Sequence, residues 1–449
     1  MRRCLMLTVS LMLAVIITAC GGATTNDIHE YEEYSHTYED TYNAEDYEST
    51  EHDTAQETRE EAIARLIAED REDLEYFAEI LRDNFPRFNS INRQLDIDLN
   101  QRLDAMYNNL GRRANPGQRF LEMEFTGLQR RLQGSGHLFP VNEFGYLYHL
   151  TSLYRERYEA GADFVPSGIW QYYYDSLRSE RAIQRFGNVE VDLDAPLSNV
   201  VANNITTEII EEGHIARMRI AQLPSWNMEQ DREIVLAFYQ EIADFDHLII
   251  DLRGNPGGAT AFFTEIIMAP LLSEPARGRY YEFITVGEQA MFLAEASREA
   301  LHIPFESTDG PIPIAGFMLG VEMTEFAMED LDSLDYVLIR NFIVMPENTV
   351  GFDGKVWVLT DAATFSGAAT SAMIAKYSGF ATLVGNPTGS VFSGMSVYRP
   401  LPNSGSIIRF DAGYVTNGEG RQLQERGIMP HYPNRSGLDA LGTVLEMIK

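Results

Sequence analysis

The chain has 449 residues and a formal net charge of −32, with 45% apolar and 23% charged residues. This length and apolar content allow a large core and more than one domain, whereas such a negative surface repels nucleic-acid phosphates and excludes nucleic acid as a partner. Both cysteines lie within the first twenty residues, so the rest of the chain forms neither a disulfide nor a thiolate metal site. We expect neither a metal nor a cofactor.

The N-terminus has the layout of a secretory signal. Arg2 and Arg3 precede an apolar run over 5–17, and small residues follow before Cys20. The order Ile17-Thr18-Ala19-Cys20 resembles a bacterial lipobox, which implies removal of 1–19 and lipidation of Cys20. A plain signal peptide or an anchor helix are the alternatives. We expect a lipid-anchored protein that faces the outside of the cytoplasmic membrane.

Composition divides the next part of the chain. Residues 20–58 predict an acidic, extended tether, because 27–57 contain twelve acids and no Lys or Arg. Residues 59–140 predict a helical module, with apolar residues three and four apart and helices from 59, over 95–110 and over 117–133. Residues 141–213 are mixed: 143–158 fit strand or helix, and strands are expected near 187–192 and 205–210.

Residues 214–449 alternate between strand and helix patterns. Strands are predicted over 214–221, 247–252, 356–359 and 381–384, and helices over 231–244, 259–271 and 365–377. This order indicates an α/β core with right-handed crossovers. Residues 273–350 are too long for an ordinary connection, and we expect them to form a lid or subdomain.

A glycine-rich turn follows the second of these strands, with the sequence Asp251-Leu252-Arg253-Gly254-Asn255-Pro256-Gly257-Gly258. Adjacent glycines at a helix start leave backbone N–H groups open to a ligand, as an oxyanion hole requires. A structural turn is the plainer alternative. A phosphate loop is disfavoured, because the spacing fits neither nucleotide fingerprint.

Two further residues are candidates for nucleophilic catalysis. Ser366 opens the predicted helix 365–377, where the helix dipole favours an oxyanion and the N–H of Gly367 is free to donate. Most serines at such a position are helix caps. His137 lies between small residues after a helix, in Gly134-Ser135-Gly136-His137. Most lone histidines are structural or solvated, and His149, His214 and His431 are rival bases.

Four motifs in order resemble the C-terminal processing and tricorn-type serine peptidases. They are the glycine-rich turn, Leu383-Val384-Gly385-Asn386-Pro387-Thr388-Gly389, Glu425-Arg426-Gly427-Ile428-Met429-Pro430 and the turn that contains His137. The resemblance implies a crotonase-like and Clp-protease-like α/β core, and spacing without gaps to the second motif puts the nucleophile on Ser366. Val391 stands where processing peptidases carry a catalytic lysine.

The resemblance therefore favours the tricorn-like branch, in which a histidine and a distant glutamate serve the serine. It implies that His137 is the base, that Glu425 orients its ring, and that N–H groups of Gly367 and of Gly257 or Gly258 hold the oxyanion. The expected function is hydrolysis of peptides or unfolded protein segments. Ala369, Gly136 and Ser135 depart from the family pattern, which leaves a second hypothesis open: a non-catalytic lipoprotein that binds peptides.

The insertion motivates that second hypothesis through four apolar residues, Phe317, Met318, Phe326 and Met328. Burial is their plainer explanation. A solute-binding lipoprotein of a transporter is disfavoured, because the chain lacks two similar α/β halves.

Overall fold

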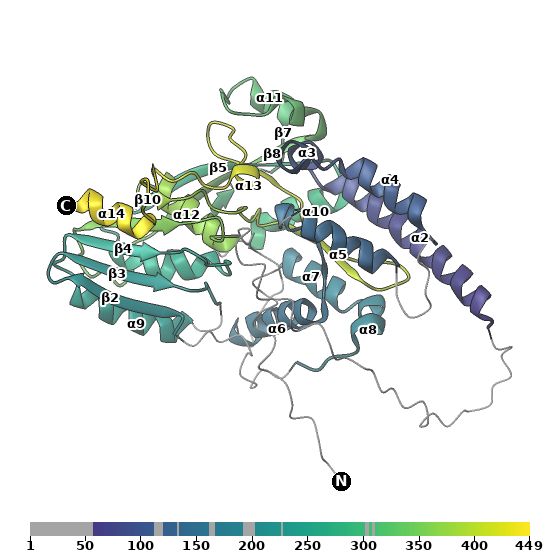
Figure 1. Cartoon of the computed structure of the whole chain (residues 1–449), viewed down its shortest axis with the longest axis horizontal. Helices are drawn as coiled ribbons and strands as arrows, with labels where there is room; N and C mark the ends of the chain where they lie inside the picture. Colours follow the sequence, from purple (N-terminus) through teal and green to yellow (C-terminus); the bar gives the residue numbers. More distant parts are fainter. Residues whose placement is uncertain are drawn as a thin grey trace, which may run out of the picture.

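The computed structural model describes residues 57–111, 120–132, 134–160, 167–191, 203–225, 228–300, 305–307 and 310–449 (Figure 1). The signal segment, Cys20 and nearly all of the predicted tether lie outside the described residues. Across the described ranges, no helix combines the length and the apolar character needed to cross a membrane.

Four helices form the N-terminal part: α2 (Arg59–Asn84), α3 (Phe88–Leu95), α4 (Leu99–Asn109) and α5 (Phe120–Leu132). Thr58 and Glu61 form a capping box that starts α2. The helix predicted over 95–110 is present as α4 and begins only at Leu99, because Asp96 adopts a left-handed conformation that ends α3 and Asp98 caps α4. The helical module is otherwise confirmed.

The mixed region is mostly helical. It contains β1 (Phe139–Val141), α6 (Glu143–Ala160), α7 (Gly168–Leu177) and α8 (Glu180–Phe186). The tyrosine-rich segment is therefore a helix, and Tyr146 and Leu150 on it are fully buried. The strand expected near 187–192 is absent from 187–191, whereas the next one is confirmed as β2 (Ile205–Glu211).

A six-stranded sheet in the order β14-β10-β9-β4-β3-β2 forms the main body. Its strands after β2 are β3 (Ile215–Ile220), β4 (His247–Asp251), β9 (Lys355–Thr360), β10 (Thr382–Gly385) and β14 (Tyr432–Pro433), which pair in parallel. One face packs on α9 (Met228–Glu241), η4 (Phe262–Met268) and α12 (Gly367–Tyr377), and the other on α14 (Ala440–Ile448) (Figure 1). The predicted α/β core is confirmed.

The insertion forms most of a second sheet. Its elements are β5 (Ala276–Ile284), α10 (Glu288–Ala300), β6 (Phe305–Ser307), β7 (Ile312–Pro313), α11 (Ile314–Met318), η6 (Met328–Ser333) and β8 (Tyr336–Val344), and β5 also pairs with β13 (Tyr414–Thr416). Phe342 joins the core of the main sheet, and Leu338 joins the core of the N-terminal helices. These strands thus tie both parts together, and a role as a lid stays a prediction.

A small three-stranded antiparallel sheet positions the site. It has the order β1-β12-β11, with β11 at Ser396–Pro400 and β12 at Ile407–Asp411. Phe139 on β1 lies opposite Arg409 on β12, and Asp411 lies opposite Ser396 on β11. This register brings the chain just before β1 to the end of β12.

Candidate active site

Ser366 lies at the N-terminus of α12, directly after the loop that leaves β9. Ser366 is the N-cap residue of this helix, yet its side chain makes no capping hydrogen bond. Its hydroxyl Oγ instead lies 3.1 Å from Nε2 of His137. The simple helix-cap interpretation of Ser366 therefore does not apply.

The backbone of Ser366 is held in an unusual conformation, with φ 53° and ψ −121°. Left-handed φ values are disfavoured for residues with a Cβ and persist where the surroundings impose them. Here the N–H of Ser366 donates to the carbonyl of Ser390 at 2.8 Å, and the N–H of Phe365 donates to Asn255 at 3.0 Å. Two neighbouring loops thus fix the direction of the serine side chain.

His137 ends a tight turn and is almost completely buried, at 3% exposure. Its ring centroid lies 5.0 Å from that of Phe365 and 5.7 Å from that of Phe392. Gly136 has a positive φ of 65° and leaves no room for a Cβ, which would lie 2.7 Å from the ring of Phe85. Close packing on both sides therefore sets the orientation of the imidazole.

A buried arginine forms a hydrogen bond with the turn that carries His137. Arg87 is fully buried and donates from Nη2 to Ser135 Oγ at 3.0 Å. Burial lowers the pKa of Arg87 to about 10, although the negative charge of Asp411 acts in the opposite direction. The guanidinium therefore stays charged at neutral pH, next to the segment that carries His137.

Asp411 completes the arrangement. Its Oδ2 lies 2.8 Å from Nδ1 of His137, and its side chain is fully buried. Gln424 Nε2 donates to the same oxygen at 3.3 Å. A serine, a histidine and a buried carboxylate thus form one hydrogen-bonded chain, the constellation that activates a serine for acyl transfer.

The expectation that Glu425 orients His137 is corrected by this geometry. The Glu425 carboxylate pairs with Arg93 of α3 at 2.9 Å. Glu425 and Gln424 are neighbours on α13 (Leu423–Arg426), and successive helical side chains point about 100° apart. Gln424 faces Asp411, so Glu425 is turned toward α3.

Asp411 was missed by sequence reasoning, although one signal was present. It is the single acid of the strand Ile407-Ile408-Arg409-Phe410-Asp411, in which the other residues except Arg409 are apolar and buried. A buried carboxylate needs a partner, which makes such an acid a candidate for a site.

The three predicted oxyanion glycines lie together. A Cβ on Gly257 would lie 2.7 Å from the nitrogen of Gly367, and a Cβ on Gly367 would collide with the carbonyl of Gly258. The N–H of Gly257 already donates to Asn255 Oδ1 at 2.9 Å. Within the described residues, the N–H groups of Gly258 and Gly367 have no protein acceptor, so these two fit an oxyanion hole.

The charged residues of the glycine-rich turn hold the scaffold. Asp251 is buried and pairs with Arg217 and Arg253, each at 2.7 Å. Burial alone would raise the pKa of Asp251, but hydrogen bonds from the two arginines outweigh it and lower that pKa. Val391 is buried and forms a bridge with Ser366, so the position of a lysine in related enzymes carries no amine here.

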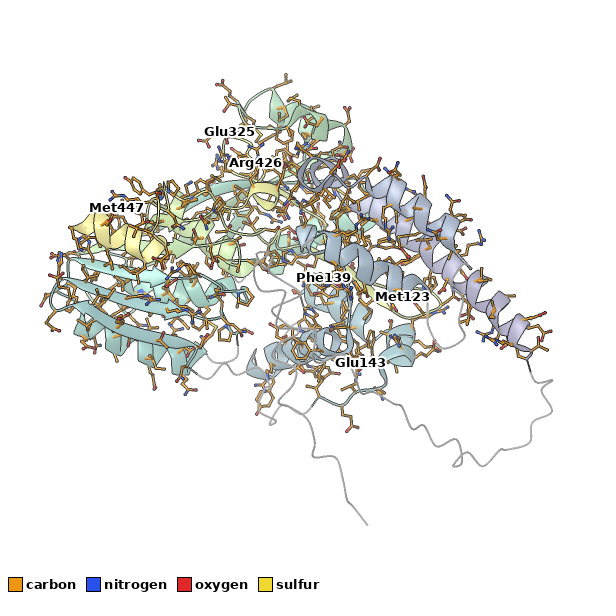
Figure 2. All side chains as sticks on the ribbon, viewed as in Figure 1. Met123, Phe139, Glu143, Glu325, Arg426 and Met447 are labelled. Carbon is orange, nitrogen blue, oxygen red and sulfur yellow. The ribbon has the colours of Figure 1, made fainter. Side chains whose placement is uncertain are left out.

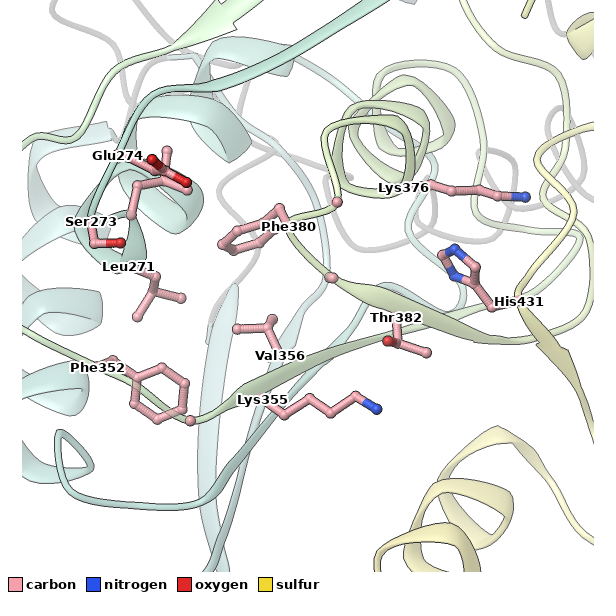
Figure 3. Close-up of a pocket in the computed structure, with 14 residues that line it drawn as sticks. Leu271, Ser273, Glu274, Phe352, Lys355, Val356, Lys376, Phe380, Thr382 and His431 are labelled. Carbon is pink, nitrogen blue, oxygen red and sulfur yellow. The ribbon is translucent and has the colours of Figure 1, made fainter. Parts of the chain in front are cut away.

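The rival histidines lie elsewhere. His214 pairs with Asp246 at 2.6 Å, and His149 contacts the hydroxyl of Tyr398. His431 lines a cavity of about 430 Å³, together with Lys355, Lys376 and Thr382 (Figure 3). The Nδ1 atom of His431 accepts a hydrogen bond from the N–H of Leu383 at 2.9 Å. Lys355 and Thr382 are the first residues of β9 and β10, so this cavity lies at the opposite end of the sheet from the end of β9 that leads to Ser366.

In the described part of the chain, no three His, Cys, Asp or Glu side chains are grouped so that they could hold a metal ion.

One family model matches the part of the chain that carries most of these residues. Residues 215–433 match the model of peptidase family S41, a range that includes Ser366 and Asp411 but not His137. No curated protein sequence matches the chain significantly.

Several solved structures are similar. A putative peptidase from Parabacteroides merdae is 15% identical, with 85% of this chain and 96% of that chain covered and a TM-score of 0.49. Mature CPAF complexed with lactacystin is 14% identical, with 82% and 94% covered and a TM-score of 0.47. A lipoprotein from Streptococcus agalactiae is 10% identical, with 85% and 96% covered and a TM-score of 0.40. These likenesses are too distant to assign a substrate or a mechanism.

Proposed function

Through its domain at residues 215–433 this chain is a member of peptidase family S41, and on that premise we propose that it hydrolyses peptide bonds with Ser366 as nucleophile and His137 as general base. The observation that carries the proposal is the hydrogen-bonded chain from Ser366 through His137 to Asp411, with distances of 3.1 and 2.8 Å. Both distances are within the range that proton transfer requires.

Each group has a role that follows from its position. Ser366 Oγ attacks the substrate carbonyl while His137 Nε2 takes the serine proton and later gives it to the leaving amine. Asp411 holds the imidazole through Nδ1 and stabilises its charged form. The N–H groups of Gly258 and Gly367 stabilise the oxyanion of the tetrahedral intermediate, and water then hydrolyses the acyl-enzyme.

The substrates that we propose are peptides or unfolded protein segments. The competing hypothesis of a non-catalytic peptide-binding protein has lost part of its basis. The side chains of Phe317 and Phe326 are each only 7% exposed and belong to one core cluster. Met328 remains exposed at 60%, which is ordinary for one surface residue.

The test is labelling and hydrolysis by the mature chain. The wild type should react with a fluorophosphonate probe and cleave members of a peptide library, whereas Ser366→Ala should do neither. A serine that is not part of the site provides the control: Ser378→Ala, at the far end of α12, should keep both activities. A wild type that is neither labelled nor active on any peptide would contradict the proposal.

We also propose export and lipidation at Cys20, supported by the N-terminal sequence alone. In bacteria that express the full chain, a fatty-acid analogue should label the wild type and not Cys20→Ser. The wild type should partition with membranes and be cleaved by protease added outside the cytoplasmic membrane. Equal labelling of both forms would contradict this part.

A further inference from the structure

Arg409 lies on strand β12 of the small sheet, two residues before Asp411. Cross-strand neighbours share a face, and Arg409 lies opposite both Phe139 of β1 and Tyr398 of β11. Asp411 is two residues further along β12 and therefore faces the same side. The backbone of Arg409 thus lies about 7 Å along β12 from that of Asp411.

Aromatic rings surround the guanidinium of Arg409. Its central carbon lies 5.1 Å from the ring centroid of Phe139, 5.5 Å from that of Tyr398 and 5.9 Å from that of Phe392. Phe392 is the same residue whose ring contacts His137. Phe139 is labelled in Figure 2, near the meeting point of α5 and the small sheet. The positive charge of Arg409 therefore lies against aromatic rings, and one of them, Phe392, also contacts His137.

Arg409 has no carboxylate partner among the described residues. Its guanidinium donates to Ser396 Oγ, which lies 3.4 Å from both Nε and Nη2, and the side chain is partly exposed. In contrast, Arg93, Arg217 and Arg253 each pair with at least two acids. Arg409 therefore presents a guanidinium without a direct acid partner close to the site, in a chain in which acids outnumber bases 67 to 35.

No acid forms a direct ion pair with Arg409 among the described residues, although Ser396 Oγ links its guanidinium to Asp411. Burial, and to a smaller extent Arg409 itself, lower the pKa of His149 to about 3, so this histidine is neutral at physiological pH. Burial raises the pKa of Tyr398 to about 12, so the phenol is neutral as well. The nearby Asp411 already accepts from His137, Gln424 and Ser396.

We propose that Arg409 binds a carboxylate of the peptide substrate within about three residues of the scissile bond, a reach set by about 3.3 Å per extended residue. The proposal rests on the peptidase function proposed above. A guanidinium presents a planar fork that matches a carboxylate, and the flanking rings hold it in place and exclude water. The carboxylate belongs either to an acidic side chain or to a free C-terminus.

The experiment compares matched peptides that differ at one position. Glu, Gln and Lys are scanned on both sides of a cleaved bond, and each peptide is made with a free and an amidated C-terminus. For the wild type, kcat/KM should be about tenfold or more higher for the carboxylate peptide at one position. A preference that survives amidation identifies an acidic side chain, and one that amidation removes identifies the C-terminus.

Variants then assign the preference. Arg409→Gln should bring the ratio of kcat/KM for Glu and Gln peptides, or for free and amidated peptides, to about 1, and Arg409→Glu should favour the Lys peptide. Arg399→Gln is the matched control, since Arg399 also stacks on a ring, that of Tyr172 at 4.9 Å, from the opposite face of β11. It should keep the wild-type ratio.

Two outcomes overturn the inference while the peptidase function stands. One is a wild type that cleaves peptides through Ser366 without any carboxylate preference. The other is Arg409→Gln lowering kcat/KM for all peptides by the same factor, which would mean that Arg409 only supports the sheet. Failure of fluorophosphonate labelling and of all hydrolysis would instead contradict the proposed function itself.

Discussion

Oδ2 of Asp411 lies 2.8 Å from Nδ1 of His137, although the two residues are 274 positions apart in the chain. The antiparallel pairing of β1 with β12 brings them near each other, because Phe139 lies opposite Arg409, and His137 and Asp411 each lie two residues beyond this last pair. The hydrogen bond is therefore a direct consequence of strand register.

Asp411→Asn should lower kcat strongly while the protein stays folded. An amide at this position favours the wrong tautomer of His137 and cannot stabilise the imidazolium, so a loss of about 10³- to 10⁴-fold is expected. Glu425→Gln is the control, because Glu425 pairs with Arg93, and it should change kcat by a small factor. The reverse order of effects in steady-state kinetics would reinstate Glu425 as the residue that orients His137.

Gly258→Ala should remove activity through the oxyanion hole. A Cβ there would collide with the carbonyl of Leu223, and the φ of 128° strains any other residue. Loss of one donor alone lowers kcat by about 10²- to 10³-fold. Gly316→Ala, which has open space around the new Cβ, should leave peptide hydrolysis unchanged. Circular dichroism checks that both variants are folded, and full activity of Gly258→Ala would exclude this N–H from the hole.

Ser366→Gly should unfold at higher urea concentration than Ser366→Ala. Both lack the nucleophile, but glycine tolerates the left-handed φ of 53° that alanine does not. Strain of this kind costs about 1–3 kcal/mol, of which the greater freedom of unfolded glycine cancels a part, so a difference of about 1 kcal/mol is expected. Equal stability of the two variants would show that the conformation of Ser366 is not strained.

Glu282 should make stability fall as pH rises toward neutrality. Burial raises the pKa of Glu282 to about 7, despite its ion pair with Arg340 at 2.8 Å. The unfolded chain titrates near 4.5, so the folded state binds the extra proton between these values and loses that advantage above pH 7.

The corresponding loss in the free energy of unfolding is about 3 kcal/mol between pH 4.5 and 7. It is measured as the difference between wild type and Glu282→Gln in urea titrations, because the other acids titrate equally in both. The wild type should become less stable relative to the variant as pH rises. A difference that changes in the opposite direction would show that the attraction of Arg340 exceeds the cost of burying the carboxylate.

Local patterns predicted most of the elements around the site. The strands that became β4, β9 and β10 are short apolar runs, and α12 begins at Gly367, next to Ser366, so period and turn signals were sufficient. The segment over 143–158 was ambiguous, because its tyrosines fit either a strand or a helix. Packing decided it: Tyr146 and Leu150 lie four apart on one buried face of α6.

The sequence by itself predicted Ser366, His137 and the glycines around them, because together they lie in motifs that resemble those of a known peptidase family. Only the tertiary structure decided which carboxylate serves His137. That choice depends on the register of two strands distant in sequence and on the rotation between adjacent residues of α13, which aims Gln424 at Asp411 and turns Glu425 toward Arg93. Neither leaves a pattern in the residues themselves, since both are set by long-range packing.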